Sequence, residues 1–471
     1  MTAAEPGLAP PRVAREFRGV WIATVANTDW PSRPGLSVAA QKAELLAILD
    51  RARLLKLNAV IFQVRPQCDA FYQSPIEPWS EYLSGAMGQP PAPFYDPLAF
   101  AIDEAHKRGL ELHAWFNPFR ARHFESKSPI APNHVSRARP ALVRPYGRYL
   151  WLDPGEPAVQ DYTLGVVMDV VRRYDVDGVQ FDDYFYPYAE TNSARKPIEF
   201  PDGPTWRKYG GNLSRDDWRR ENVNHLIERT YSSIKSAKPW VKFGVSPFGV
   251  WRPGFPPQAQ GVFDAYGRLY GDSRKWLASG WVDYFSPQLY WPIQPPRTSF
   301  PALLHWWSQQ DRLNRPLWPG LAAYNADKWP PNEITRQITI TREETDVSGY
   351  VLYSAGSLLK HAQPGQQLER LNGQCALVPA MPWLAGPSPP PAQPNLSVTA
   401  GPARRLRLNW TPLGPVPVRW WLIQQKTPRG WTTEILPGGV SSDAAEPDLQ
   451  AAAVTAVDRV GRLSPPRLVP R

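Results

Sequence analysis

Two adjacent carboxylates close a short apolar run in the stretch DVDGVQFDDYFYP, residues 175–187, and aromatic residues follow them directly. A polar turn would explain Asp182 and Asp183 without any function. The chemical explanation is a catalytic carboxylate at the mouth of a barrel. Paired carboxyl groups suit, for example, hydrolysis of a glycosidic bond, which normally uses two of them. We therefore take both residues as candidate catalytic groups.

Polar residues share one face late in several apolar runs, because side chains two apart point to the same side of a strand. Buried polar groups cost free energy unless they are paired, so this pattern indicates a binding site. The alternative is a hydrogen-bonded polar layer that closes the barrel, with His113 as a core histidine. The residues that share a face are Gln63 with Arg65, His113 with Trp115 and Asn117, Gln180 with Asp182, and Ser286 with Gln288 and Tyr290.

The second catalytic carboxyl is less well defined by the pattern. Alternation directs Asp182 inward, whereas Asp183 joins it only if the backbone turns. Asp69, which follows the second apolar run, is the other candidate. Further carboxyls stand in long loops or open a helix: Glu77, Glu199, Asp202 and Asp272.

Aromatic, amide and arginine side chains gather at the ends of the same runs. Flat aromatic rings stack on sugar faces while amides and arginines pair with hydroxyls, so this mixture favours carbohydrate. A metal site would need His, Asp or Glu from several runs, and we expect neither metal nor cofactor. Serine acyl transfer is disfavoured because there is no G-x-S-x-G motif. The expected substrate-binding residues are Trp21, Gln63, Arg65, Asn117, Arg120, Tyr184, Gln288, Tyr290, Trp291 and Tyr324.

The elements that must position these residues repeat a strand-then-helix pattern eight times. Eight such units predict an α/β fold, a (β/α)₈ TIM barrel. A doubly wound sheet is the alternative, but no G-x-G-x-x-G turn is present. The expected strands lie in 17–25, 58–66, 110–119, 176–185, 241–249, 282–291, 316–324 and 349–355. The expected helices lie in 37–57, 96–109, 156–174, 214–237, 272–280, 299–313 and 332–344.

The pattern changes after the eighth unit. Residues 381–394 are rich in proline and predict a linker. Residues 395–471 contain short alternating runs, among them 404–410 and 418–426, which predict a small β-sandwich of fibronectin type III-like form. We therefore expect an N-terminal tail over 1–16, a barrel over 17–380, the linker, and the sandwich.

Composition limits the possible partners. The 471 residues carry a net charge of +10, but no Lys/Arg block or zinc-finger spacing indicates nucleic acid. No apolar run approaches about 20 residues, so no membrane span is expected. The start of the chain lacks a visible signal peptide. The two cysteines, Cys68 and Cys375, form neither a disulfide framework nor a metal-ligand cluster.

The chain resembles the glycosyl hydrolase-like 10 family of bacterial proteins. The matching segments include EFRGVWIATVANTDWPS, HAWFNPFRA, DGVQFDDYFYP, GVSPFGVWR and DSRKWLASGWVDYFSPQLYW, in the right order between residues 16 and 358. The resemblance implies a TIM-barrel glycosidase of the cell envelope, periplasm or exterior, acting on cell-wall glycan. Broadly similar retaining glycosidases place an acid after the sixth strand, whereas here that strand ends in Gln288 and Tyr290.

Two hypotheses follow from these patterns. The first is a glycoside hydrolase that cleaves a bacterial polysaccharide, the glycan strands of peptidoglycan. In it Asp182 is nucleophile, base or stabiliser and Asp183 or Asp69 supplies the second carboxyl, while the sandwich positions the enzyme or binds polymer. The second is a non-catalytic glycan-binding barrel protein of the cell envelope.

Overall fold

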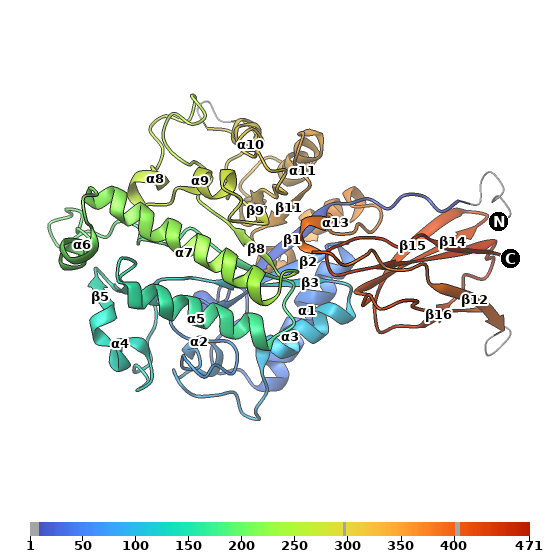
Figure 1. The fold of residues 1–471 in the computed structure, drawn as a ribbon, viewed down its shortest axis with the longest axis horizontal. Helices are drawn as coiled ribbons and strands as arrows, with labels where there is room; N and C mark the ends of the chain where they lie inside the picture. The colour runs from blue at the N-terminus through green and yellow to red at the C-terminus, as the bar shows by residue number, and fades with distance from the viewer. Residues whose placement is uncertain (1–8, 295–297, 361, 401–405) are drawn as a thin grey trace.

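The computed structural model describes residues 9–294, 298–360, 362–400 and 406–471. Figure 1 shows a large helix-covered part and, at its side, a smaller part made of strands. Residues 1–8 of the expected tail and residues 404–405 of an expected strand lie outside the described residues.

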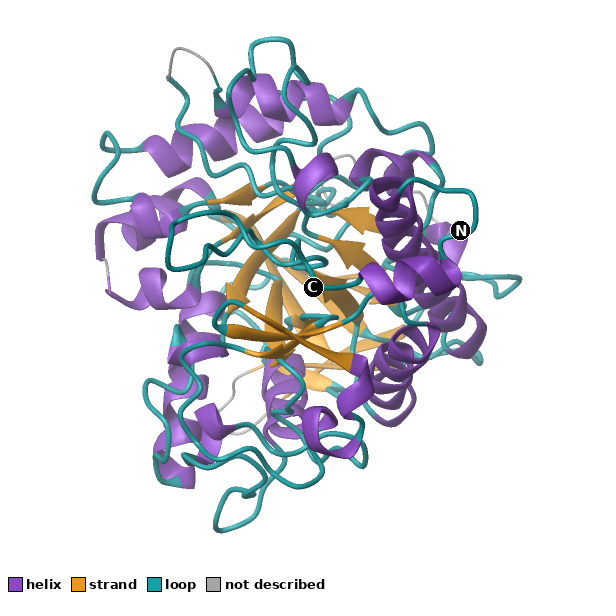
Figure 2. Ribbon diagram, turned by 90° about the vertical axis from the view of Figure 1, so that its left-hand side faces the viewer, coloured by secondary structure: helices purple, strands orange, loops and turns teal. Residues whose placement is uncertain are grey.

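The large part is built on eight parallel strands in the order β10-β11-β1-β2-β3-β7-β8-β9. Bridges from Phe285 to Leu317 and from Gln288 to Gly320 bring the two ends of this sheet together. The arrangement is consistent with a (β/α)₈-like fold, and we call it the barrel (Figure 2). Its strands are β1 (Phe17–Ile22), β2 (Ala59–Arg65), β3 (Glu111–Phe116), β7 (Gly178–Phe181), β8 (Lys242–Val245), β9 (Tyr284–Phe285), β10 (Gly320–Leu321) and β11 (Gly349–Leu352).

Each strand is followed by a helix, as the sequence predicted. Ser37 caps the first long helix by accepting a hydrogen bond from the backbone N–H of Ala40, and Asp96 and Ser214 cap two others in the same way. These side chains satisfy N–H groups that have no partner inside the helix. The helices are α1 (Val38–Leu54), α3 (Pro97–Lys107), α5 (Pro157–Arg173), α7 (Arg215–Ala237), α9 (Ser273–Ala278), α10 (Phe300–Ser308), α11 (Glu333–Glu343), α12 (Ala355–Lys360) and α13 (Ala362–Leu371).

The strands separate two apolar clusters. One, with Val60, Phe62 and Phe116, lies between the strands and the helices around them. The other, with Ile61 and Trp115, fills the barrel interior. Alternate residues of a strand thus face opposite clusters, which fixes the side chains that can reach the mouth of the barrel.

Several short elements in the loops were not predicted, because they have too few residues for a clear hydrophobic period. One is a small antiparallel sheet of order β4-β6-β5, inserted between β3 and α5. These elements are β4 (Arg120–Arg122), β5 (Val143–Tyr146), β6 (Tyr149–Leu152), α2 (Glu81–Ser84), α4 (Val135–Ala138), α6 (Gly203–Tyr209) and α8 (Ala265–Arg268).

The smaller part consists of two antiparallel sheets, of orders β12-β13-β16 and β15-β14-β17-β18. Leu408 and Trp410 of the first sheet share an apolar cluster with Trp421 and Val454 of the second. The strands are β12 (Asn395–Ala400), β13 (Leu406–Thr411), β14 (Trp420–Thr427), β15 (Gly430–Pro437), β16 (Ser442–Ala444), β17 (Ala451–Val457) and β18 (Arg467–Pro470).

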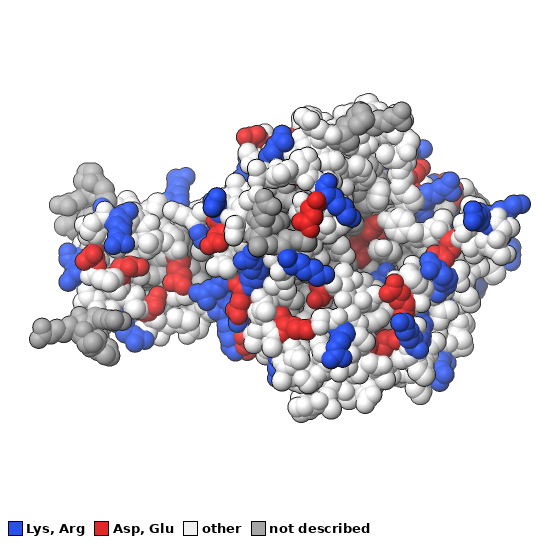
Figure 3. All heavy atoms as spheres, turned by 180° about the vertical axis from the view of Figure 1, so that it is seen from behind, with Lys and Arg blue, Asp and Glu red and all other residues white. Residues whose placement is uncertain are grey.

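Basic and acidic side chains are interspersed over the face drawn in Figure 3. None of the helices in the described part of the chain is long and apolar enough to cross a membrane.

Candidate functional site

A pocket of about 210 Å³ opens at the carboxyl ends of the barrel strands. Six of the residues predicted from the sequence line it, and six strands or the loops after them contribute its walls. Chemistry in such barrels takes place at this end. The lining residues are Trp21, Trp115, Asp182, Asp183, Tyr184, Ser246, Gln288, Tyr290 and Tyr353.

Asp182 directly follows β7, and both oxygens of its carboxyl accept hydrogen bonds. The indole N–H of Trp115 donates to its Oδ2 at 3.0 Å, and the side-chain amide of Asn117 donates to the same oxygen. The backbone N–H of Tyr184 donates to Oδ1 at 3.1 Å. Only 5% of the residue is exposed, so its carboxyl is fixed in place and largely removed from water.

Asp183 also lines the pocket, because the chain bends directly after the strand and the Phe185 N–H bonds to the Asp183 carbonyl at 3.0 Å. The Tyr188 hydroxyl donates to Oδ2, and the Gln288 amide donates to Oδ1 at 3.0 Å. Gln288 is itself anchored on the Ser246 carbonyl at 2.8 Å. The backbone turn that alternation alone did not supply is therefore present.

The two carboxyls affect each other's charge. Burial, followed by the nearby charge of Asp183, raises the pKa of Asp182 to about 7. Burial also raises the pKa of Asp183, while hydrogen bonds from Tyr188 and Gln288 oppose that rise. The pair can therefore hold a proton near neutral pH, which is what an acid catalyst requires.

Three predicted polar residues, Gln63, Asn117 and Arg120, do not line the pocket but form a hydrogen-bond network that holds Asp182. The Gln63 amide and the Arg120 guanidinium both donate to the Asn117 side-chain oxygen at 2.7 Å. This orients the Asn117 amide so that its N–H₂ group faces Asp182. The Arg120 guanidinium also lies 4.8 Å from the centre of the Tyr184 ring.

Aromatic rings form one wall of the pocket. Tyr353 lies 6.1 Å from Trp21 and 5.8 Å from Tyr290, measured between ring centres. Tyr324 contacts both tyrosines at 6.0 Å but is 43% exposed, at the outer edge of this group. Such a wall suits the apolar face of a sugar ring.

Arg65 is placed away from the pocket. A register shift between Gln63 and Arg65 sets Arg65 opposite Phe116, whose side chain belongs to the outer cluster. Such a bulge adds one residue and reverses the face that alternation predicts. Arg65 instead forms a fully buried ion pair with Glu77 at 2.6 Å.

Two further predicted residues do not line the pocket. Asp69 is fully buried beneath the loops and accepts a hydrogen bond from Gln67 at 2.8 Å. Burial raises its pKa to about 7, but it has no access to the pocket that holds the other two carboxyls. Trp291 packs against Phe248, with ring centres 5.6 Å apart.

The sequence prediction omitted Ser246 and Tyr353 from the site. Ser246 is two residues after Gly244 of β8, and Tyr353 is two residues after Val351 of β11, which belongs to the interior cluster. Extending the alternation to the fifth and eighth runs would have identified both. His113 is a core residue, bonded to the Tyr284 hydroxyl at 2.9 Å.

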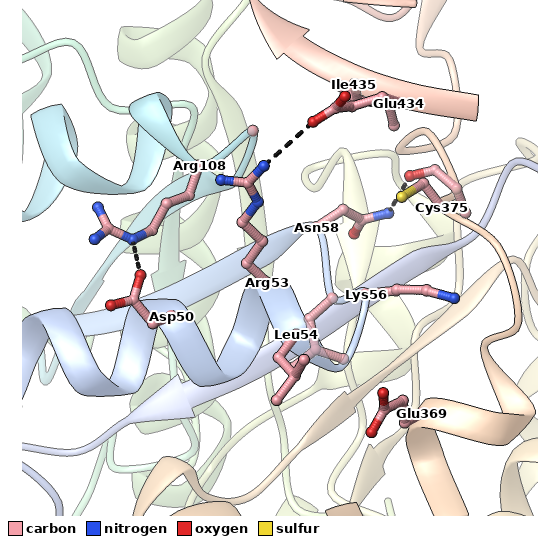
Figure 4. A pocket seen from close by; sticks show the side chains of 13 residues that line it. Asp50, Arg53, Leu54, Lys56, Asn58, Arg108, Glu369, Cys375, Glu434 and Ile435 are labelled. Carbon is pink, nitrogen blue, oxygen red and sulfur yellow. Dashed lines mark hydrogen bonds and ion pairs between the residues drawn. The ribbon is translucent and has the colours of Figure 1, made fainter. Parts of the chain in front are cut away.

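A larger hollow, of about 460 Å³, lies at the opposite end of the barrel strands. Four of its charged side chains form two ion pairs, Arg53 with Glu434 and Arg108 with Asp50 (Figure 4). The hollow lies away from the carboxyl ends of the strands, where chemistry in such barrels takes place, so we assign the chemistry to the smaller pocket. Nowhere in the described ranges do three or more His, Cys, Asp or Glu side chains gather in a way that could hold a metal ion.

Comparison with known proteins identifies the family of the chain. A family model described as glycosyl hydrolase-like 10 matches residues 16–334. The glycosyl hydrolase YngK of Bacillus subtilis (strain 168) is 42% identical over 402 residues, covering 82% of this chain and 77% of the relative. The glycosyl hydrolase DigH of Escherichia coli (strain K12) is 37% identical over 391 residues, covering 75% and 87%.

Among solved structures, the glycoside hydrolase domain of PgaB (BpsB) from Bordetella bronchiseptica is 14% identical with a TM-score of 0.48. The match covers 76% of this chain and 98% of that one, a likeness too distant to bear on function. The family model and both relatives identify the chain as a glycoside hydrolase. The resemblance seen in the sequence motifs is confirmed, and the chain belongs to the glycosyl hydrolase-like 10 family.

Proposed function

We propose that this protein hydrolyses O-glycosidic bonds in the glycan strands of bacterial peptidoglycan, with Asp182 and Asp183 as its catalytic carboxyls. The observation that carries the proposal is the buried carboxyl pair in an aromatic-walled pocket at the carboxyl ends of the barrel strands. Asp69 has no catalytic role in this proposal, because it does not reach the pocket.

The two carboxyls have different roles. Asp182, whose pKa of about 7 keeps it partly protonated at neutral pH, gives its proton to the glycosidic oxygen as the bond to the anomeric carbon breaks. Asp183 accepts hydrogen bonds from Tyr188 and Gln288, which favour its ionised form. As a carboxylate it stabilises the positive charge that develops on the sugar ring.

The walls of the pocket bind the sugar. Trp21, Tyr184, Tyr290 and Tyr353 offer ring faces and hydroxyls, and Gln288 offers an amide to a sugar hydroxyl. Tyr324 extends this surface outward for the next sugar of the polymer.

The choice of polymer rests on the family resemblance and on charge. The resemblance implies action on cell-wall glycan, and a net charge of +10 favours association with the anionic wall. We place the protein in the cell envelope, periplasm or exterior. The chain divides into the tail, the barrel over 17–380, the linker, and a fibronectin type III-like sandwich over 395–471 that positions the enzyme or binds polymer.

The test is a panel of purified polymers: peptide-free glycan strands, chitin, cellulose and xylan, with release of reducing ends as the measurement. We expect release from the glycan strands in preference to cellulose and xylan. Release from cellulose or xylan alone would contradict the proposed substrate, and no release from any wall polymer would favour the non-catalytic binding hypothesis.

A further inference from the structure

The position of the two carboxyls limits how the anomeric carbon can be attacked. In the usual glycosidase mechanisms the two carboxyls flank the scissile bond, one on the leaving group and the other, or its activated water, on the opposite face. Asp182 and Asp183 are consecutive and follow one strand, β7, so both approach the sugar from the same side of the pocket. Within the described residues that line the pocket there is no third carboxyl to complete the flanking pair.

Neither carboxyl is free to swing across the pocket. Asp182 takes hydrogen bonds on both oxygens, from Trp115 and Asn117 on one and the Tyr184 N–H on the other. Asp183 is likewise held on both oxygens, by Tyr188 and Gln288. Five donors fix the pair where it stands, and moving either carboxyl would leave buried donors without partners.

The other side chains of the pocket are poor nucleophiles. Burial raises the pKa of the Tyr290 and Tyr353 phenols above the ordinary value, so both stay protonated at neutral pH. Ser246 needs a neighbouring base, and the described lining residues include neither histidine nor lysine. The pocket thus has an acid and a carboxylate but no protein group suited to attack.

We infer that the nucleophile comes from the substrate: the carbonyl oxygen of a 2-acetamido group attacks the anomeric carbon of its own sugar. As that C–O bond forms, the bond to the leaving oxygen breaks, and this oxygen takes the proton of Asp182. The product is a cyclic oxazolinium ion, and its ring N–H donates a hydrogen bond to the Asp183 carboxylate. Water then attacks the anomeric carbon and gives a proton to Asp182, and the ring opens to restore the acetamide.

The inference rests on the proposed function and narrows the substrate. The acetamido oxygen must approach from the face opposite the leaving group, which requires a β-linked 2-acetamido sugar and yields a product of retained configuration. The aromatic wall of Trp21 and Tyr353 beside the carboxyl pair offers apolar surface to the acetyl methyl group.

The experiment compares two forms of the same peptide-free glycan strands. The strands are de-N-acetylated and then re-acylated, one sample with acetyl and the other with trifluoroacetyl groups, which have similar shape but a much less nucleophilic oxygen. We expect kcat to fall by about 10²-fold on the trifluoroacetyl strands with KM nearly unchanged, because binding remains and the attacking group is weakened. The first product, followed by NMR, should be the β-anomer, and Asp183→Asn should reduce the difference between the two substrates.

The outcomes separate the two claims. Equal kcat on both strands, or a first product of inverted configuration, overturns the inference and leaves the proposed hydrolysis standing. No reducing ends from the re-acetylated strands, when chemically untreated strands also give none, overturns the proposed function itself.

Discussion

At the scale of single residues, burial links the chemistry of Asp182 to the pH of the solution. Only 5% of the residue is exposed, and it shares a pocket with a second buried carboxyl, Asp183. Separating either one from water disfavours its charge, and placing them together disfavours two charges more strongly. In the proposed mechanism, the surroundings that keep Asp182 protonated also set the pH range of catalysis.

We expect kcat/KM on glycan strands to fall as the pH rises through about 7. The pKa of Asp182 is raised to about 7, the active form is the protonated one, and that form is lost above its pKa. A pH–rate profile between pH 5 and 9 measures this. A rate that stays constant up to pH 9 would contradict the role of Asp182 as the proton donor.

Arg65, which the sequence pattern placed in the binding site, stabilises the fold instead. Arg65→Met removes the cation of a fully buried pair and leaves the Glu77 carboxylate without it, so the free energy of unfolding should fall by about 3–5 kcal/mol. Urea denaturation measures the change, and kcat of the folded fraction should remain that of the wild type.

The matched control is Arg53→Met. Arg53 pairs with Glu434, but both side chains are about half exposed, so the loss should be under about 1 kcal/mol. Equal losses for the Arg65 and Arg53 variants would contradict the structural role of Arg65.

At the scale of elements, the sequence was sufficient for the regular parts of the fold. All eight strands and seven of the helices fall within the predicted ranges, because hydrophobic period and caps such as Ser37 act locally. The bulge that turns Arg65 outward and the bend that brings Asp183 inward depend on backbone geometry that cannot be predicted from the residue types alone. The strands that carry the pocket and the position of Asp182 could therefore be predicted from the sequence, whereas the full set of lining residues could not.

Gly244 in β8 shows how closely the barrel interior is packed. A Cβ at this position would lie 2.2 Å from ring carbons of the buried Tyr284, so Gly244→Ala must displace that ring or the strand that leads to Ser246. We expect a loss of about 1–3 kcal/mol in the free energy of unfolding, measured by chemical denaturation.

Gly165→Ala in α5 is the control for this substitution. Apart from its chain neighbours and the backbone of its own helix, no atom lies within 4 Å of a Cβ there, and alanine favours a helix, so stability should rise by about 0.5–1 kcal/mol. A Gly244→Ala protein as stable as wild type would show that the interior is looser than the structure has it.

At the scale of the whole molecule, the C-terminal sheets are joined to the end of the barrel opposite the pocket of Asp182 and Asp183. Arg419, next to β14, pairs with Asp177, next to β7, at 2.6 Å, and both side chains are at most 10% exposed. Burial alone would raise the pKa of Asp177, but Arg419 and His106 hold it well below the usual value. The pocket at the carboxyl ends of the strands is therefore left uncovered where the two parts are joined.

Arg419→Ala should lower the free energy of unfolding at pH 7 by about 2–5 kcal/mol. Because the folded-state pKa of Asp177 is depressed, this stabilisation is fully present above the unfolded pKa of about 4 and is lost progressively as the pH falls from there through the lower folded-state pKa. Denaturation at pH 7 and at pH 3.5 checks both points, with Arg429→Ala in the exposed β14–β15 turn as the control. A difference that grows in acid would contradict the ion-pair explanation.

The most direct test of the central claim measures reducing ends released from peptide-free glycan strands by wild type, Asp182→Asn and Asp161→Asn. Asp161 is an exposed carboxyl on α5 paired with Arg229, and serves as the matched control. We predict that Asp182→Asn loses about 10²–10⁴-fold in kcat while folding normally, and that Asp161→Asn retains the wild-type rate. Release by Asp182→Asn at the wild-type rate would contradict the assignment of catalysis to this carboxyl pair.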